Sequence, residues 1–181
     1  MSAYVHPSAV VGDNYKPAPF TLVDAEVVIG AHVITGPFVH LRYGAHLADN
    51  VMLGDHVTVH DGAIIGALSV VGDGSVVGKR PVTNIREEHA VTMPGVVLGE
   101  RCILGAGVVI GAGTVLGDGV HVGDGTVIAE GCTLGAGCVL GRGVTVEQGA
   151  HVAAGVEVGS GALVGDGASV ESNLAPGQAL A

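Results

Sequence analysis

Histidine 60 is the side chain in this sequence best placed for chemistry, because charged residues precede it at a regular interval and a cationic segment follows it. Asp24, Arg42, His60 and Gly78 are evenly spaced along the chain, and the cationic segment begins directly after Gly78, at Lys79. An imidazole can take a proton from an amine or hydroxyl, while nearby cations hold anionic substrate groups. We therefore expect acyl transfer with His60 as general base, Arg42 keeping the ring neutral and binding substrate, and Asp24 orienting Arg42.

The cationic segment, residues 79–95, reads KRPVTNIREEHAVTMPG and contains three of the seven cations of the chain. These are Lys79, Arg80 and Arg86, which we expect to bind substrate, and the segment also holds His89, an alternative general base. Binding groups often lie on excursions from a regular scaffold. We expect the segment to project and to contact the substrate or an adjacent subunit. The alternatives are an ordinary surface insertion and simple charge pairing around His60.

Aliphatic residues recur every six positions along most of the chain, which indicates short repeated strands. Between positions 98 and 170 every residue at this spacing is aliphatic, and between 5 and 77 the same holds with only Pro17 and Thr35 as exceptions. The residue two before each aliphatic is small in nearly every repeat. Residues two apart in a strand face the same side. Each repeat is therefore expected to be a strand with one small and one large residue inward.

Three such strands can close a triangular turn, and stacked turns form a solenoid of parallel sheets. Residues three repeats apart then share a corner, which places Asp24, Arg42 and His60 in one column. The separation of Val77 and Leu98 is not a whole number of repeats, so the ladder must be interrupted between them. We expect one all-β domain over residues 1–181, with repeat blocks 3–78 and 96–171, a protruding loop 79–95 and a short tail 172–181.

The composition argues against several classes of function. The chain has 17 Asp and Glu against seven Lys and Arg, a formal net charge of −10, and 3% aromatic residues. Nucleic acid is not an expected partner, because it is bound by basic surfaces and aromatic stacking. Gly and Ala interrupt the long uncharged stretches, so no membrane span is expected. The first residues, MSAYVHPSAV, lack the pattern of a signal peptide, and we expect a cytoplasmic protein.

The cysteines and the outward residues lead to two further predictions. Cys102, Cys132 and Cys138 occupy the small inward position, so we expect buried, reduced thiols rather than disulfides or zinc ligands. The residue before each inward aliphatic points outward, yet more than half of these outward residues are large and apolar. Exposed apolar rows of this size usually mark an interface. We therefore expect the prism to associate with other copies.

The six-residue pattern resembles the hexapeptide-repeat transferases, and the resemblance covers almost the whole chain. It implies a left-handed parallel β-helix, a homotrimer with active sites between subunits, and acetyl-CoA or another acyl-CoA as co-substrate. The hand of the helix comes from this resemblance alone. In that family coenzyme A lies along the C-terminal turns, where Arg101 and Arg142 are the cations of this chain. The resemblance thus implies that these two arginines bind coenzyme A.

Two short segments resemble particular branches of this superfamily. VTVHDG at 57–62 is similar to the segment that carries the catalytic histidine of the UDP-N-acetylglucosamine O-acyltransferases, with His60 at that place and an Asp where that family has a basic residue. The start YVHPSA and the block–loop–block layout are similar to nucleotide-linked amino-sugar N-acetyltransferases. The loop sequence VTN at 82–84 is similar to their FTN segment, which implies that Asn84 binds substrate. Together they imply acetyl transfer to an amine or hydroxyl of a nucleotide-linked sugar or a similar small molecule.

Two other functions occur on this fold and stay as alternatives. A γ-type carbonic anhydrase needs metal-binding histidines, two of them five positions apart, and no histidine pair here has that spacing; His56 and His60 are four apart. We therefore expect no metal. A non-catalytic β-helix, such as an ice-binding or assembly protein, would not need a cationic segment beside a histidine. An acyl-CoA-dependent acyltransferase is the leading hypothesis.

Overall fold

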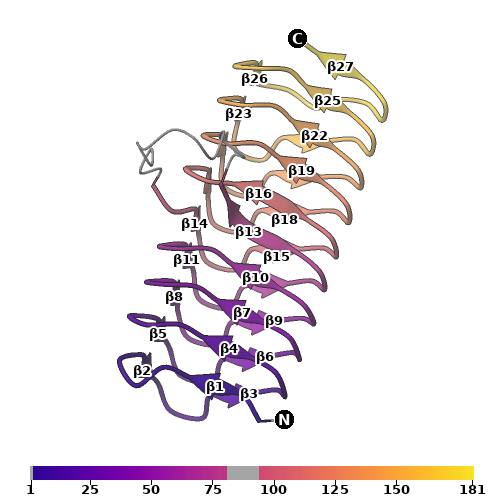
Figure 1. The fold of residues 1–181 in the computed structure, drawn as a ribbon. Helices are drawn as coiled ribbons and strands as arrows, with labels where there is room; N and C mark the ends of the chain where they lie inside the picture. The colour runs from indigo at the N-terminus through magenta and orange to yellow at the C-terminus, as the bar shows by residue number, and fades with distance from the viewer. Residues whose placement is uncertain (1, 81–93) are drawn as a thin grey trace, which may run out of the picture.

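A computed structural model describes residues 2–80 and 94–181 of the chain. Its strands are two to four residues long and lie in three parallel sheets, which form the sides of a prism with the termini at opposite ends (Figure 1). The described residues contain no helix. The predicted fold class, an all-β left-handed parallel β-helix, is confirmed.

The three sheets contain ten, nine and eight strands and are called sheets A, B and C. Sheet A consists of β1 (Tyr4–Val5), β4 (Leu22–Val23), β7 (His40–Leu41), β10 (Thr58–Val59), β13 (Val76–Lys79), β16 (Val109–Gly111), β19 (Val127–Ile128), β22 (Thr145–Val146), β25 (Leu163–Val164) and β27 (Ala179–Leu180). Sheet B consists of β2 (Val10–Val11), β5 (Val28–Ile29), β8 (His46–Leu47), β11 (Ile64–Ile65), β14 (Val97–Leu98), β17 (Val115–Leu116), β20 (Thr133–Leu134), β23 (His151–Val152) and β26 (Ser169–Val170). Sheet C consists of β3 (Lys16–Pro17), β6 (Ile34–Thr35), β9 (Met52–Leu53), β12 (Val70–Val71), β15 (Ile103–Leu104), β18 (His121–Val122), β21 (Val139–Leu140) and β24 (Glu157–Val158).

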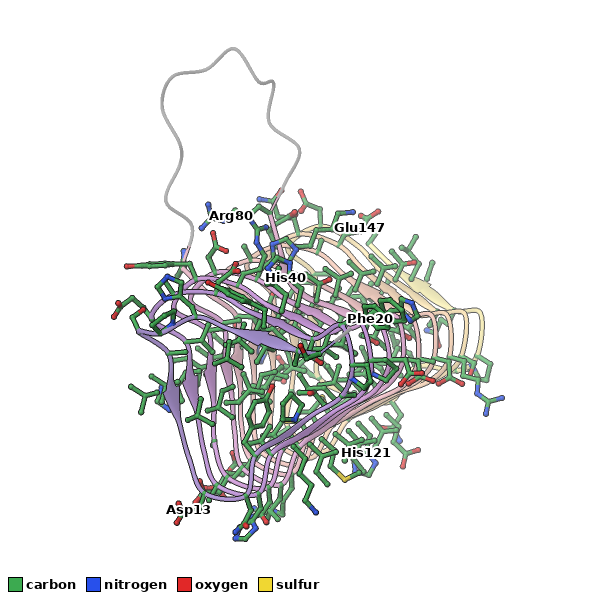
Figure 2. All side chains as sticks on the ribbon, turned by 60° about the horizontal axis from the view of Figure 1, so that its bottom comes forward. Asp13, Phe20, His40, Arg80, His121 and Glu147 are labelled. Atoms are coloured by element: carbon green, nitrogen blue, oxygen red, sulfur yellow. The ribbon has the colours of Figure 1, made fainter. Side chains whose placement is uncertain are left out.

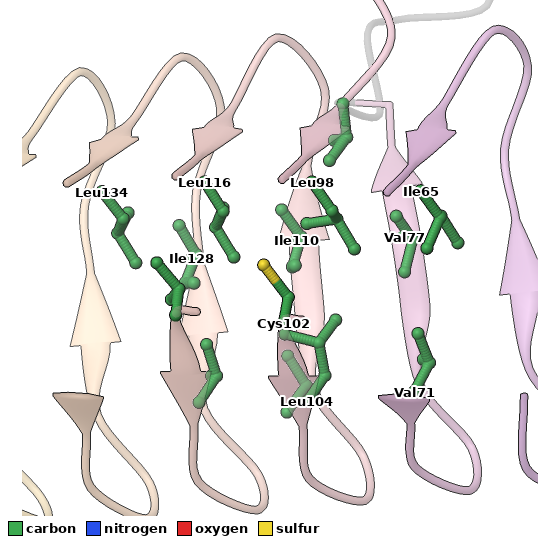
Figure 3. Close-up of a cluster of buried hydrophobic side chains, with 14 of the residues drawn as sticks. Ile65, Val71, Val77, Leu98, Cys102, Leu104, Ile110, Leu116, Ile128 and Leu134 are labelled. Carbon is green, nitrogen blue, oxygen red and sulfur yellow. The ribbon is translucent and has the colours of Figure 1, made fainter. Parts of the chain in front are cut away.

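The interior is formed by the second residue of each strand and the small residue two positions earlier, as predicted. Ile65, Leu98, Ile110 and Leu134 point inward from neighbouring rungs and are almost fully buried (Figure 3). Cys102 lies among these aliphatic side chains in the same view, and all three cysteines are buried free thiols. A core this thin needs no aromatic ring, because each rung adds only three small and three aliphatic side chains.

Strand pairing follows the predicted spacing of three repeats on both sides of the interruption. Leu22 pairs with His40 before the interruption and Val115 pairs with Thr133 after it, each pair separated by three repeats. Across the interruption Ile64 pairs with Val97, so the extra sequence between β13 and β14 is accommodated without shifting the stack. This inserted segment leaves sheet A after β13 and returns at β14 of sheet B. It is attached at the edge where sheet A passes into sheet B, here called the A–B corner.

The last residues extend the prism beyond the predicted block boundary at residue 171. Leu174 bridges to Val158 of β24, and β27 pairs with β25. Leu163 pairs with Ala179, whereas the regular spacing would pair it with Ala181, so this final rung is shorter than the others. The segment expected as a tail therefore completes sheet A at the C-terminal end of the prism.

Within residues 2–80 and 94–181, no helix is long and apolar enough to cross a membrane.

Candidate functional site

Asp24, Arg42 and His60 stack on successive rungs at the A–B corner, as their spacing predicted. Each follows a strand of sheet A, and its backbone N–H donates to a carbonyl of the next rung: Asp24 to Leu41 at 2.9 Å, and Arg42 to Val59 at 2.9 Å. Gly78 continues the column, since a Cβ placed on it would lie 3.2 Å from the Cβ of His60. The backbone ladder thus brings these groups to the place where the inserted segment begins.

Arg42 donates a hydrogen bond from Nη1 to Nδ1 of His60 over 3.0 Å. A guanidinium has donors but no acceptor, so Nδ1 must be the unprotonated nitrogen of the ring. The proton of the neutral imidazole therefore sits on Nε2. In this arrangement His60 presents a hydrogen-bond donor at Nε2, while its basic nitrogen is occupied by Arg42.

Burial and the neighbouring cations lower the pKa of His60 below its ordinary value. Desolvation is the largest cause, followed by the positive charge of Arg42; Arg80 and His40 lower it further, and Asp61 opposes them. The direction agrees with the expectation that Arg42 keeps the ring neutral. His60 is thus a neutral imidazole held in one tautomer.

Asp61 is the carboxylate that holds Arg42, and the sequence reasoning did not single it out. Its Oδ1 lies 3.2 Å from Nε of Arg42 and its Oδ2 lies 3.3 Å from Nη2 of Arg80. The carboxylate therefore links the column to the start of the inserted segment. Asp61 directly follows His60 in the chain and so lies at the same corner. Its position in the sequence could therefore have identified it as a partner of Arg42.

The predicted orientation of Arg42 by Asp24 is wrong. Asp24 instead accepts a hydrogen bond from Nε2 of His40 over 2.9 Å, and both side chains are about one-third exposed (35%). His40 is the first residue of β7 and faces outward from sheet A, diagonal to Asp24 on the next rung. The nearer carboxylate, Asp61, takes Arg42, and Asp24 is left to pair with the imidazole.

The other predicted substrate-binding residues divide between the described and the undescribed parts of the chain. Lys79 ends β13 and is exposed, and Arg80 reaches Asp61 as described above. Figure 2 shows Arg80 and His40 on the same side of the prism, beside the attachment of the inserted segment. Asn84, Arg86 and His89 lie outside the described residues.

The two arginines expected to bind coenzyme A lie at other corners than this column, and at different corners from each other. Arg101 follows β14 and pairs with Glu100 at 3.1 Å, where sheet B passes into sheet C. Arg142 follows β21, where sheet C passes into sheet A, and its Nε lies 3.4 Å from Asp124. The fold therefore does not bring Arg101 and Arg142 together.

His56 and His60, the pair considered for metal binding, are also at different corners. His56 stacks on Phe38 with ring centroids 4.8 Å apart, and Phe38 stacks on Phe20 at 4.7 Å. This exposed aromatic ladder runs along the edge between sheets C and A, whereas His60 lies at the A–B corner. Among the described residues, no group of three or more His, Cys, Asp or Glu is arranged to hold a metal ion.

Comparison with known proteins identifies the repeat and solved structures that share the fold. Residues 113–148 match the repeat family described as bacterial transferase hexapeptide (six repeats), and residues 89–112 and 95–130 match the hexapeptide repeat of succinyl-transferase. No curated protein matches the chain.

Several solved structures share the fold. UDP-N-acetylglucosamine acyltransferase from Campylobacter jejuni is 17% identical with a TM-score of 0.63, over 96% of this chain and 69% of that one. The corresponding acyltransferase from Bacteroides fragilis is 21% identical with a TM-score of 0.56, over 96% and 67%. The acetyltransferase domain of PglB from Neisseria gonorrhoeae, solved also in complex with acetyl coenzyme A, is 22% identical with a TM-score of 0.59, over 70% and 54%.

At these identities the likeness is one of fold. The chain thus carries the bacterial transferase hexapeptide repeat and shares the fold of these solved structures, as the resemblance predicted.

Proposed function

We propose that this protein is an acyl-CoA-dependent acyltransferase that moves an acetyl group to an amine or hydroxyl of a nucleotide-linked sugar or a similar small molecule. One observation carries the proposal: a neutral imidazole, two arginines and two carboxylates converge at the A–B corner, where the inserted segment is attached. Acyl transfer from a thioester needs such a group of proton-handling and charge-binding side chains. The structural neighbours are acyltransferases, one of them solved in complex with acetyl coenzyme A.

The charge balance at this corner favours an acceptor with an anionic group. Arg42, Arg80 and exposed Lys79 carry three positive charges against the two carboxylates of Asp61 and Asp24, so one positive charge is left over. Cations that retain unused donors are suited to phosphate oxygens. A diphosphate-linked sugar fits this chemistry. Substrate binding by Asn84 and Arg86, a base role for His89 and coenzyme A binding by Arg101 and Arg142 stay predictions.

We also propose that the active form is a homotrimer in a reducing compartment such as the cytoplasm. The support for an oligomer is the set of exposed outward side chains, among them Ile64 at 44%, Ile103 at 46% and Val115 at 42%. Apolar rows of this length are costly to leave in water. The three buried free thiols support the compartment. Light scattering of the wild-type protein at micromolar concentration tests the trimer, and a monomer would contradict it.

Coenzyme A binding is the decisive test of the proposed function. Coenzyme A at 100 times its dissociation constant should raise the free energy of unfolding by about 2.7 kcal/mol, which a thermal-shift titration detects. Release of free thiol from acetyl-CoA should then be followed with UDP-glucosamine, which offers an amine, and UDP-N-acetylglucosamine, which offers hydroxyls. A melting temperature that does not move with coenzyme A would refute the proposal.

A further inference from the structure

Two histidines, His60 at the A–B corner and His40 on the adjoining outer face of sheet A, have hydrogen-bond partners of opposite kind. His60 accepts a hydrogen bond at Nδ1 from Arg42, a group that can only donate. His40 donates a hydrogen bond from Nε2 to Asp24, whose ionised carboxylate can only accept. His40 begins β7 and His60 follows β10 on the adjacent rung, and a positive charge on His40 lowers the pKa of His60. Their partners therefore determine which ring can accept a proton and which can donate a hydrogen bond.

His40 is the ring with a basic nitrogen to offer. With the proton on Nε2 directed at Asp24, the lone pair is on Nδ1, and no hydrogen bond to that atom is formed by residues 2–80 or 94–181. The side chain is 35% exposed and faces outward from sheet A, so an acceptor can reach it. A carboxylate bonded to the far nitrogen of an imidazole holds the tautomer and stabilises the imidazolium that forms when the ring takes a proton.

His60 is the ring with a proton to offer. Its basic Nδ1 is occupied by Arg42, and Arg42 is itself held by Asp61 at 3.2 Å. For His60 to act as a base at Nδ1, Arg42 would have to give up this hydrogen bond, although Asp61 holds its guanidinium in place. As it stands, Nε2–H of a neutral ring can donate to an oxygen that gains negative charge, because a fixed donor aimed at such an oxygen stabilises the transition state.

We propose that His40 is the general base, Asp24 its positioning residue, and His60 the hydrogen-bond donor to the oxyanion; this assignment rests on the proposed acyl transfer. The acceptor nitrogen or oxygen attacks the thioester carbonyl carbon, and Nδ1 of His40 takes the acceptor proton. The carbonyl electron pair moves to oxygen, which accepts from Nε2–H of His60. When the C–S bond breaks, the pair returns to the carbonyl, and the sulfur leaves with the proton from His40 as free coenzyme A.

Histidine-to-glutamine variants separate the two roles when acetyl-CoA is offered two acceptors. With UDP-glucosamine, His40→Gln should lower kcat by about 10²- to 10⁴-fold, and His60→Gln by about 10²- to 10³-fold. Hydroxylamine attacks thioesters without a base, so with hydroxylamine His40→Gln should come within about tenfold of wild type, whereas His60→Gln should stay low. His121→Gln is the matched control, because His121 faces outward from sheet C, away from His40 (Figure 2), and both its rates should equal wild type.

Three outcomes would overturn the assignment. They are a His40→Gln enzyme that keeps more than about a tenth of wild-type kcat, recovery of His60→Gln but not His40→Gln by hydroxylamine, and a wild-type protein that binds coenzyme A but transfers acetyl to neither acceptor. Failure of the proposed function is seen separately, as a wild-type protein whose melting temperature does not respond to coenzyme A.

Nitrogen-15 NMR of the histidine rings tests the arrangement without any acceptor. Both His40 and His60 should show a protonated Nε2 and an unprotonated Nδ1 near pH 8, with resonances assigned from the glutamine variants. Asp24→Asn should mix the tautomers of His40, because an amide can donate as well as accept, and should leave the pattern of His60 unchanged. It should also lower kcat by about tenfold or more with little change in KM. A proton on Nδ1 of His40 in the wild-type protein would overturn the proposal.

Discussion

The corners before and after the inserted segment have the same backbone but different residues. Nearly every corner contains a residue with positive φ, and before residue 80 glycine supplies three of these 11 positions; Gly78 also has positive φ but lies within β13. After residue 94 it supplies 12 of 13, with Arg101 as the exception. The N-terminal corners instead place larger side chains there, such as Phe38 (φ 59°), His56 (φ 56°) and Leu68 (φ 60°).

This difference separates the scaffold from the surface that carries side-chain chemistry. A left-handed conformation costs a non-glycine residue roughly 1–2 kcal/mol, so the glycines after residue 94 form the less strained prism. The Asp24–His40 pair and the group of Arg42, Asp61 and Arg80 all lie in the N-terminal part. On the same A–B corner beyond the segment, Ala129, Glu147, Gln148 and Asp166, together with neighbouring strand residues of sheet A, line a shallow groove of about 400 Å³.

Truncating a buried side chain should destabilise the two repeat blocks equally. This loss of stability is the largest effect expected. Ile29 in the first block and Ile128 in the second are both 1% exposed. Replacing either with Ala should lower the free energy of unfolding by about 2–5 kcal/mol, through lost burial and the cavity that remains. Urea denaturation of the two variants measures this. A cost below about 1 kcal/mol at one site only would show that the blocks differ in packing as well as at their corners.

The reactivity of the three cysteine thiols measures how well the interior of the second repeat block is shielded from solvent. Burial raises the pKa of Cys138 from 9.0 to about 11, and desolvation also raises the pKa of Cys102 and Cys132. A rise of this size lowers the thiolate fraction about 100-fold, and the thiolate is the reactive form. Cys138 in native protein should therefore react with a disulfide reagent about 100-fold more slowly than in protein unfolded in urea. Equal rates would mean that this interior opens readily.

Exchanging residues within one corner column tests how much the non-glycine residues with positive φ before residue 80 lower the free energy of unfolding. Leu68 and Gly119 lie in the same column between sheets B and C; Leu68 is 54% exposed, and a Cβ on Gly119 would meet nothing within 4 Å. Gly119→Leu should lower the free energy of unfolding by about 1–2 kcal/mol, because only backbone strain is added. Leu68→Gly should raise it by less than about 1 kcal/mol, since relief of strain is offset by a freer unfolded chain. Thermal unfolding measures both, and a destabilising Leu68→Gly would show that the side chain makes a contact that outweighs its strain.

The pH dependence of stability should show the smallest effect, through His60. Its pKa is lowered in the folded protein, chiefly by desolvation and then by Arg42, while in the unfolded chain it titrates near its ordinary value of about 6.5. As the pH falls through that value the unfolded state takes up a proton that native His60 does not, so the free energy of unfolding falls. The His60→Gln variant lacks this contribution of His60. Its free energy of unfolding should therefore fall less than that of wild type between pH 8 and pH 5.5. Identical slopes in denaturant titrations would contradict a depressed pKa.

The sequence by itself determined the strands, the inward rows and the rung and corner of each side chain. Small and aliphatic residues two apart lie on the same face of a strand, so only that face of each strand can point inward. The spacing of three repeats was enough to place Asp24, Arg42 and His60 in a column. The burial of the three cysteines followed from the same six-residue period, which places them at inward positions. The shortened last rung did not follow from it, because Leu174 pairs with Val158 earlier in the chain than the regular spacing requires.

Only the tertiary structure decided which outward groups pair. A side chain at a corner has neighbours above, below and diagonally, and several lie within reach of a long arginine. Asp24 could have taken Arg42 one rung away, yet it bonds His40, and Asp61 takes Arg42 and Arg80. Spacing assigns a residue to a corner, whereas hydrogen bonding depends on side-chain direction over a few ångströms. That direction set the tautomer of His60 and hence the chemistry its ring can offer.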